Sequence, residues 1–332
     1  MNKKKILLFY TAGILILIIS ILASLTYGAK SVGLGDLLSA LSGKSGDGFL
    51  ADIVKARIPR TIFGLLAGAA LSVSGVLMQS ITRNPLADPG ILGVNTGAAL
   101  FIVTGIAIFN IQSKLAYFGF SFAGALLSAC LVYAIASLGK GGATPIKLAI
   151  SGLATSMVLS SAVSLLVMPD SSVMTTYRFW QVGSIGGTDM EDIYMILPVL
   201  ILSIIVSILI SGNLDTLLLS EETAVSLGLN VKLTKGVAAF LGVLLSASVT
   251  ALAGPIGFVG LMVPHVIRKI TGDSHRHLII ASTVYGGAVL LLSDILGRIL
   301  GRPGELESGI MTALIGAPVF VYIIRKAGIR NT

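Results

Sequence analysis

The chain has 332 residues, of which 55% are hydrophobic and 11% charged, and its formal net charge at pH 7 is +8. Its mean hydropathy of +0.96 lies outside the range of soluble proteins, in which about 25% of residues are charged. The composition therefore excludes a soluble enzyme or binding domain and indicates a membrane protein. A membrane bundle of this length forms one unit, so we expect a single domain over residues 1–332.

Ten apolar stretches follow one another, and most are long enough to cross about 30 Å of hydrocarbon as helices. They are residues 6–27, 61–82, 91–109, 115–138, 148–168, 193–212, 236–253, 257–270, 277–297 and 308–324. We predict an all-α, polytopic bundle of about ten transmembrane helices. The titratable side chains expected deep inside are only His265 and a few neutral Tyr and Cys, whereas ion-coupled carriers normally keep Asp, Glu or Lys there. The energy for any transport is then expected to come from a partner.

The first stretch, 6–27, exceeds the roughly 7–15 apolar residues of a signal peptide, so we expect it to stay as a helix. With the N-terminus in the cytoplasm, alternate loops place 14 of the 23 Lys and Arg residues inside and ten of the 15 acidic residues outside. The positive-inside rule thus favours the cytoplasmic membrane with both termini in the cytoplasm. The basic residues form no stripe with interleaved aromatics, which argues against nucleic acid as a partner.

Four arginines lie on the predicted outer side and run against that rule. Arg57 and Arg60 precede the second stretch, and Arg298 and Arg302 follow the ninth. They either cap helix ends and contact lipid headgroups, or form fixed cations for carboxylates of an extracellular partner.

The outer segment 169–192 contains Tyr177, the only tryptophan, Trp180, and glycines at 183, 186 and 187. The aromatic residues either anchor the chain at the membrane interface or belong to a short helix that closes the mouth of a pathway, with the glycines as its hinge.

The inner loop 213–235 contains the sequence EETAVSLGLN at 221–230. Ser220 is a plausible N-cap, Glu221 and Glu222 suit a first helical turn, and Gly228 suits the position after the last turn. We predict a helix of about two turns that is too short and polar to span. It either lies on the membrane surface or serves as a knob for a cytoplasmic partner.

Gly254-Pro255 is expected to break the chain between two helices, and Pro264 to kink the next. We expect His265 to bond a carbonyl freed by Pro264, and Cys130 to be a buried small hydrophobe. His275 and His277 are expected in a solvated cytoplasmic turn. The sequence contains no phosphate-binding loop, catalytic constellation or convincing metal-ligand set.

Six motifs occur in a fixed order: RIPR (57–60), RNPLADPGILGVNTGA (83–98), WQVGS (180–184), EETAVSLGLN (221–230), GPIGFVGLMVPH (254–265) and ELESGIMTALIGAPVF (305–320). Their order and spacing resemble the FecCD-type permeases, the membrane subunits of importers for ferric siderophores, haem and cobalamin. The resemblance covers nearly the whole chain.

The resemblance implies the ABC type II importer permease fold and a dimer of permease subunits, the second being this chain or a paralogue. It also implies a cytoplasmic ATPase dimer, which binds Mg-ATP, and an extracytoplasmic substrate-binding protein. The chain itself is then a transport subunit rather than an enzyme, surrounded by lipid and without a bound cofactor or metal.

The resemblance also assigns roles to residues of this sequence. A coupling helix for the ATPase is implied by Ser220, Glu221, Glu222, Ala224, Leu227 and Gly228. Docking of the binding protein is implied for Arg57, Arg60, Arg298 and Arg302. The translocation path or its gates are implied for Asn95, Gly141, Gly142, Thr144, Trp180, Gly183 and Ser184. Glu307 departs from the family, which usually has proline there, and we expect Arg302 to compensate its charge.

We therefore predict an importer permease that moves an iron–siderophore complex, with cobalamin or haem as the alternative cargo. An ion-coupled secondary transporter and an integral membrane enzyme are the rival classes. The enzyme would require a cluster of His, Asp or Glu at one membrane depth, which is not visible in the sequence.

Overall fold

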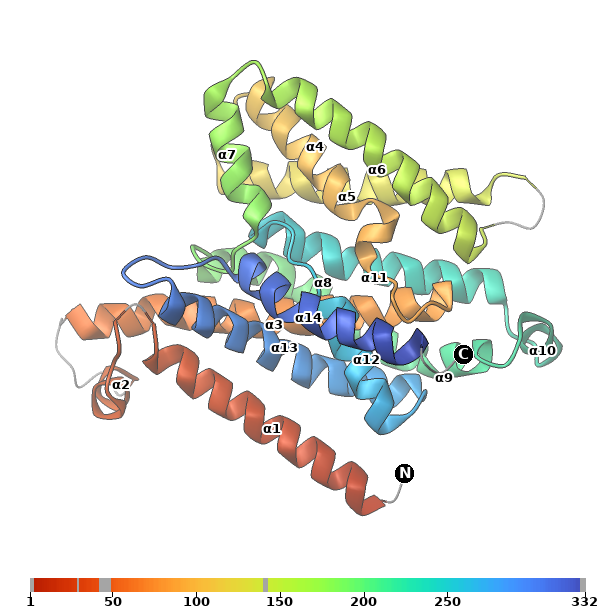
Figure 1. Cartoon of the computed structure of the whole chain (residues 1–332), viewed down its shortest axis with the longest axis horizontal. Helices are drawn as coiled ribbons and strands as arrows, with labels where there is room; N and C mark the ends of the chain where they lie inside the picture. The colour runs from red at the N-terminus through yellow and green to blue at the C-terminus, as the bar shows by residue number, and fades with distance from the viewer. Residues whose placement is uncertain (1–2, 29, 42–48, 140–142, 329–332) are drawn as a thin grey trace.

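The computed structural model describes residues 3–28, 30–41, 49–139 and 143–328. This part of the chain is all-α, without a strand (Figure 1). In chain order the elements are α1 (Lys3–Thr26), α2 (Leu34–Leu41), α3 (Phe49–Thr82), the 3-10 helix η1 (Pro89–Leu92), α4 (Val94–Ala107), α5 (Lys114–Ser137), α6 (Pro145–Val167), α7 (Ser171–Val182), α8 (Met190–Leu209), α9 (Ser211–Leu217), α10 (Glu221–Ser226), α11 (Val231–Ala253), α12 (Val259–Thr271), α13 (His275–Leu300) and α14 (Ser308–Gly328).

Each of the ten predicted apolar stretches contains a helix. Among the described residues, seven helices are long and apolar enough to cross a membrane: α1, α3, α5, α6, α8, α11 and α13. The shorter α4 and α12 and the helix α14 occupy the other three stretches. The all-α polytopic bundle is thus confirmed, although α3 begins at Phe49, well before the predicted residue 61, and continues through Pro59.

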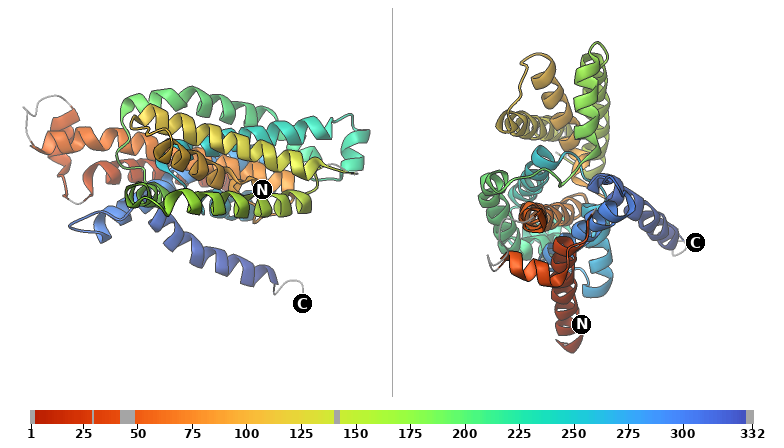
Figure 2. Two further views of the ribbon diagram at one scale, coloured as in Figure 1. Left: turned by 90° about the horizontal axis from the view of Figure 1, so that it is seen from above. Right: turned by 90° about the vertical axis from the view of Figure 1, so that its left-hand side faces the viewer.

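Helix α3 runs through the middle of the bundle and packs against α11, α12 and α13. Helices α4 to α7 form a second group on one side, whereas α1 and α14 lie on the periphery (Figures 1 and 2). We call the end that holds α10 and both termini the α10 end. The opposite end, where α2, the start of α3 and the turn between α13 and α14 lie, is the arginine end.

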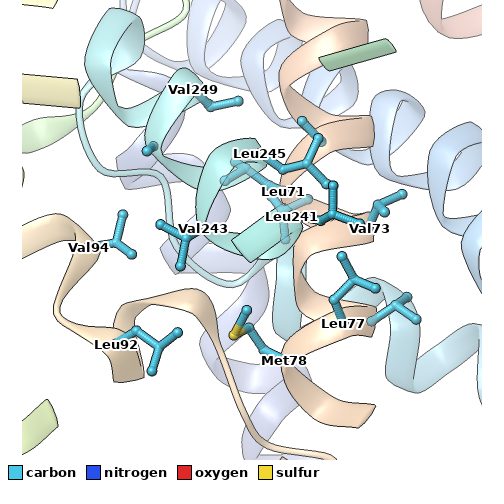
Figure 3. Packing of buried hydrophobic residues seen from close by; sticks show 14 of the residues in the cluster. Leu71, Val73, Leu77, Met78, Leu92, Val94, Leu241, Val243, Leu245 and Val249 are labelled. Atoms are coloured by element: carbon cyan, nitrogen blue, oxygen red, sulfur yellow. The ribbon is translucent and has the colours of Figure 1, made fainter. Parts of the chain in front are cut away.

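Glycines bring α3 into backbone contact with its neighbours. A Cβ added at Gly75 would lie 1.8 Å from the carbonyl oxygen of Gly260 in α12, and one at Gly68 would lie 2.3 Å from that of Gly286 in α13. Small residues at such crossings let membrane helices pack closely where lipid supplies no hydrophobic drive for association. Beside these crossings, Leu71, Leu77 and Met78 of α3 pack into one apolar core with side chains of α11 (Figure 3).

The predicted break at Gly254-Pro255 is present, because α11 ends at Ala253 and α12 begins at Val259. The expectation for His265 is wrong: neither ring nitrogen has a hydrogen-bond partner among the described residues. Pro264 lacks the N–H that would bond the carbonyl of Gly260, and Gln79 of α3 donates to that carbonyl from Nε2 at 3.3 Å instead. Cys130 is exposed on α5, so its expected burial is also wrong.

The Gly75 contact predicts a specific loss of stability. Gly75→Ala is expected to destabilise the protein by about 1–3 kcal/mol or more, because two backbones must separate. Gly236→Ala is the control, since nothing lies within 4 Å of a Cβ there, and it should be neutral or stabilising by up to about 1 kcal/mol. Thermal unfolding in detergent measures both, and equal behaviour of the two variants would contradict the close contact.

Candidate functional site

Asp294 of α13 organises the charges at the arginine end. Its side chain is fully buried and accepts hydrogen bonds from Arg60 of α3, at 3.1 Å from Nε and 2.8 Å from Nη2. The Nε of Arg298 lies 3.0 Å from the same carboxylate, and the hydroxyl of Ser308 donates to it at 2.8 Å. The expectation that no carboxylate lies deep in the stretch 277–297 is therefore wrong. Two arginines compensate the buried charge, and the i, i+4 spacing of Asp294 and Arg298 was the sequence signal for this pairing.

Two of the predicted docking arginines fasten the end of α1. Arg57 donates from Nη1 to the carbonyl oxygens of Leu25 and Thr26, both at 3.0 Å, and Arg298 donates to that of Ser24 at 3.0 Å. Carbonyls in the last turn of a helix lack intrahelical donors and favour a nearby cation. Arg57 is 8% exposed and Arg298 1%, so the capping explanation describes their contacts and neither is a free surface cation.

Arg302 also has an internal partner. Its Nε and Nη2 donate to the carbonyl oxygen of Gly28, at 3.2 and 2.5 Å. The guanidinium thus bonds the segment that follows α1, and the expected compensation of Glu307 by Arg302 stays a prediction.

A cationic recess opens beside these groups. Its volume is ≈ 300 Å³, and its lining contains four cationic residues and one carboxylate, Lys30, Arg57, Arg60, Arg298 and Glu305. The carboxylate of Glu305 accepts from Nη1 of Arg60 at 2.6 Å and keeps 39% of its side chain exposed. Arg60 therefore holds the buried Asp294 with one part of its guanidinium and an accessible carboxylate with another. A recess of this charge suits an anionic group of a partner.

The predicted short helix of the outer segment is α7. Its N-cap is Asp170, whose pKa lies below its ordinary value because the side chain and backbone of Ser172 donate to it. The helix ends at Gly183, which has φ 75°. Trp180 is partly buried and stacks on Tyr177, with ring centroids 6.4 Å apart.

The residues after α7 join two further elements. Ser184 donates its backbone N–H to the carbonyl of Ala253 at 2.7 Å, and Gly309 of α14 donates to that of Gly183 at 2.8 Å. A Cβ at Gly183 would lie 2.2 Å from the carbonyl oxygen of Pro255. Gly183 thus allows a close backbone contact between the α7–α8 segment, the α11–α12 turn and the start of α14.

Two further predicted path residues, Asn95 and Thr144, lie at the starts of different helices. Asn95, in the first turn of α4, accepts from the hydroxyl of Thr250 at 3.3 Å. Thr144 caps α6 by accepting from the N–H of Lys147 at 3.3 Å. Gly141 and Gly142 lie outside the described residues.

The predicted coupling segment forms α9 and α10 at the α10 end (Figure 1). Ser220 caps α10 by accepting from the N–H of Thr223 at 3.0 Å, and Gly228 has φ 84°, so both predicted caps are confirmed. The helix has six residues, which agrees with the expected length of about two turns. Ala224 is fully buried, whereas Leu227 is 66% exposed, so one face anchors the helix and the other presents apolar side chains. Glu222 is exposed beside them; Glu221 starts the helix.

His275 is buried, which contradicts the expectation of a solvated turn. Its side chain is 1% exposed, and its Nδ1 lies 2.7 Å from a carboxylate oxygen of Asp215 in α9. His277 is bonded through Nδ1 to the hydroxyl of Tyr10 at 2.9 Å. The sequence showed two histidines beside an arginine, but the partner of His275 lies 60 residues away in the chain.

Comparison with known proteins identifies the family. The model of the FecCD transport family matches residues 16–326. The chain belongs to this family. It is 39% identical to the ferric enterobactin transport system permease protein FepD of Escherichia coli (strain K12), over 94% of this chain and 93% of that protein. It is 38% identical to the Fe(3+)-citrate import system permease protein YfmD of Bacillus subtilis (strain 168), over 96% and 95%.

A solved structure described as an inward-facing metal-chelate type ABC transporter superposes with a TM-score of 0.83 and 29% identity, covering 95% of this chain and 98% of that one. The protein therefore has the ABC type II importer permease fold and is a multi-pass membrane transport subunit.

Asp294 is predicted to be essential for the stability of the FecCD chain. Asp294→Asn removes the buried charge that the guanidinium groups of Arg60 and Arg298 share, and breaking a buried pair costs about 3–5 kcal/mol. Asp189→Asn is the control, because the pair of Asp189 with Lys114 is exposed and should cost at most about 1 kcal/mol. Chemical denaturation in detergent measures both; a small effect at Asp294 would contradict the proposed organisation of the network.

Proposed function

We propose that this chain is the permease subunit of an ATP-driven importer that carries an iron–siderophore complex through the cytoplasmic membrane by alternating access. Two such subunits, this chain twice or with a paralogue, would enclose the path. A substrate-binding protein would deliver the complex at the arginine end, and a separate ATPase pair would act at the α10 end. Both termini would then lie in the cytoplasm.

The proposal rests on one observation: two different contact surfaces lie at opposite ends of the same FecCD bundle. The recess in which Arg60 holds the accessible carboxylate of Glu305 lies at the arginine end. At the other end, Leu227 is exposed directly after α10 (Figure 1). Cationic recesses favour carboxylates of a docking protein. An exposed apolar knob beside Glu222 suits a groove in a cytoplasmic subunit.

The buried charges support an external energy source. Ion-coupled carriers bind and release their ion at intramembrane carboxylates. Among the described residues, the buried carboxylate of Asp294 is instead held by Arg60 and Arg298, at distances of 2.8–3.0 Å for the closest atoms. A carboxylate held by two arginines is a poor site for reversible ion binding, which favours a partner's ATP hydrolysis as the energy source.

The cargo proposal rests on the named relatives. FepD is described as part of a ferric enterobactin system and YfmD as part of an Fe(3+)-citrate system. Cobalamin is the alternative, because a cobalamin import system permease protein, BtuC of Halobacterium salinarum, is 38% identical over 82% of this chain. Uptake of ferric siderophores against labelled cobalamin, in cells that depend on this chain, separates the two.

The α10 surface predicts how the ATPase binds. A tagged chain captured from its own membranes in mild detergent should bring down a stoichiometric ATPase. Leu227→Ser is expected to reduce that recovery at least tenfold, because a large exposed apolar side chain is lost from the proposed contact surface. Glu222→Ala should reduce it as well.

Leu38→Ser is the matched control, since Leu38 is 67% exposed and Leu227 66%, but Leu38 lies in α2 at the other end. Equal recovery from the Leu227 and Leu38 variants would contradict coupling through α10.

We expect a carboxylate of the binding protein to replace Glu305 as the partner of Nη1 of Arg60. Glu305→Gln frees Nη1 of Arg60 for a partner's carboxylate, so the binding protein recovered by capture should bind several-fold more tightly. Glu307→Gln changes the net charge equally, but no ion pair involves Glu307 in the described part of the chain. Surface plasmon resonance with both variants in lipid nanodiscs measures the difference; identical affinities would refute direct competition at Arg60.

A further inference from the structure

Three helices meet in one chain of hydrogen bonds at the α10 end. Oδ1 of Asp215 in α9 accepts from the backbone N–H of His275, the first residue of α13, at 2.7 Å. The same oxygen lies 2.7 Å from Nδ1 of that histidine. On the other side of the ring, Nε2 lies 2.6 Å from the hydroxyl of Ser80 in α3. The ring is 1% exposed, so water does not compete for these bonds.

All hydrogen bonds of this series can form in either protonation state of His275. The carboxylate of Asp215 accepts, so Nδ1 carries a proton. In the neutral ring, Nε2 accepts from the hydroxyl of Ser80. In the imidazolium, Nε2 donates to that hydroxyl, which then donates to the carbonyl oxygen of Val76 at 2.6 Å. Bonds that include an ionised partner are stronger than neutral ones.

A second contact holds the far end of α9. Arg83, in the turn after α3, donates from Nη2 to the carbonyl oxygen of Leu217 at 2.8 Å. Leu214 and Leu217 are buried. Helix α9 is therefore fixed directly to the start of α13 and, through His275 and Arg83, to the end of α3. The adjoining α10 is anchored mainly through the buried Ala224, whereas residues 222, 223, 225 and 226 are exposed.

From these contacts we propose that Ser80, His275 and Asp215 are positioning residues that transmit the displacement of α9 and α10 to α3 and α13. The two receiving helices touch backbone to backbone at Gly68 and Gly286, so they move as one body. At their other end the same helices hold Arg60 and Asp294. The link thus connects the ATPase surface with the arginine end through continuous packed helices.

This inference rests on the proposed function, because it assumes that the displacement of α10 originates in an ATPase. The first test asks whether His275 holds α9 in place. It measures hydrogen exchange of residues 211–219 in the purified chain in lipid nanodiscs. His275→Ala should raise exchange there about tenfold or more, since it removes a buried bond to a carboxylate. His277→Ala is the control, because His277 bonds Tyr10 of α1 and not α9.

The second test uses the complete complex in proteoliposomes. His275→Ala should retain ATP hydrolysis within about twofold but lower uptake per ATP about tenfold. His275→Asn separates the two sides of the ring, because its amide reaches Asp215 in place of Nδ1 but does not reach Ser80. It should restore protection of α9 yet leave uptake uncoupled, and Ser80→Ala should behave like His275→Asn.

Unchanged exchange in His275→Ala, or uptake and hydrolysis that fall in parallel, would overturn the link. Full recovery of uptake in His275→Asn would overturn the role of Ser80. If the wild-type chain captures no ATPase, the proposed function fails, and that result is distinct from a failure of the link.

Discussion

Helix α3 packs so closely against α12 and α13 that the backbones touch, and this packing depends on Gly68 and Gly75. Because lipid gives no hydrophobic drive for helix association, such contacts and a few polar bonds must hold the bundle together. The same helix carries Arg60 near one end and Ser80 near the other. The position of both functional ends therefore depends on a crossing in the middle of the bundle, where no larger side chain fits.

The buried charges follow from that packing. A carboxylate in hydrocarbon is costly unless it is paired and hydrogen-bonded, and Asp294 meets this condition because α3 brings Arg60 beside α13. The surplus of cations at this end serves two purposes. Arg57 and Arg298 fasten the last turn of α1, whereas Arg60 reaches the recess where Glu305 is exposed. Arginines that look alike in the sequence thus differ in their surroundings: two are buried structural contacts, and the docking that we propose would use Arg60.

The sequence predicted what depends on local pattern. The apolar stretches located the helices, and Ser220 and Gly228 located both ends of α10, because caps and periodicity act over a few residues. It did not predict pairings between distant residues. Arg57 and Arg298 donate to backbone carbonyls of α1, and a sequence does not show which carbonyl will lie near which side chain. His275 was placed in solvent for the same reason, since Asp215 reaches it only through the fold. Asp294 lies within an apolar stretch, and Arg298 one turn later is the sequence signal for its charge partner.

The central claim is that transport is driven by a partner's ATP hydrolysis and not by an ion gradient. Uptake of radioactive iron complexed to a panel of siderophores tests it most directly, in cells whose uptake depends on this chain. ATP depletion at a maintained membrane potential should abolish uptake, and an ionophore at constant ATP should leave it largely intact. Uptake that survives ATP depletion and stops with the ionophore would contradict the account.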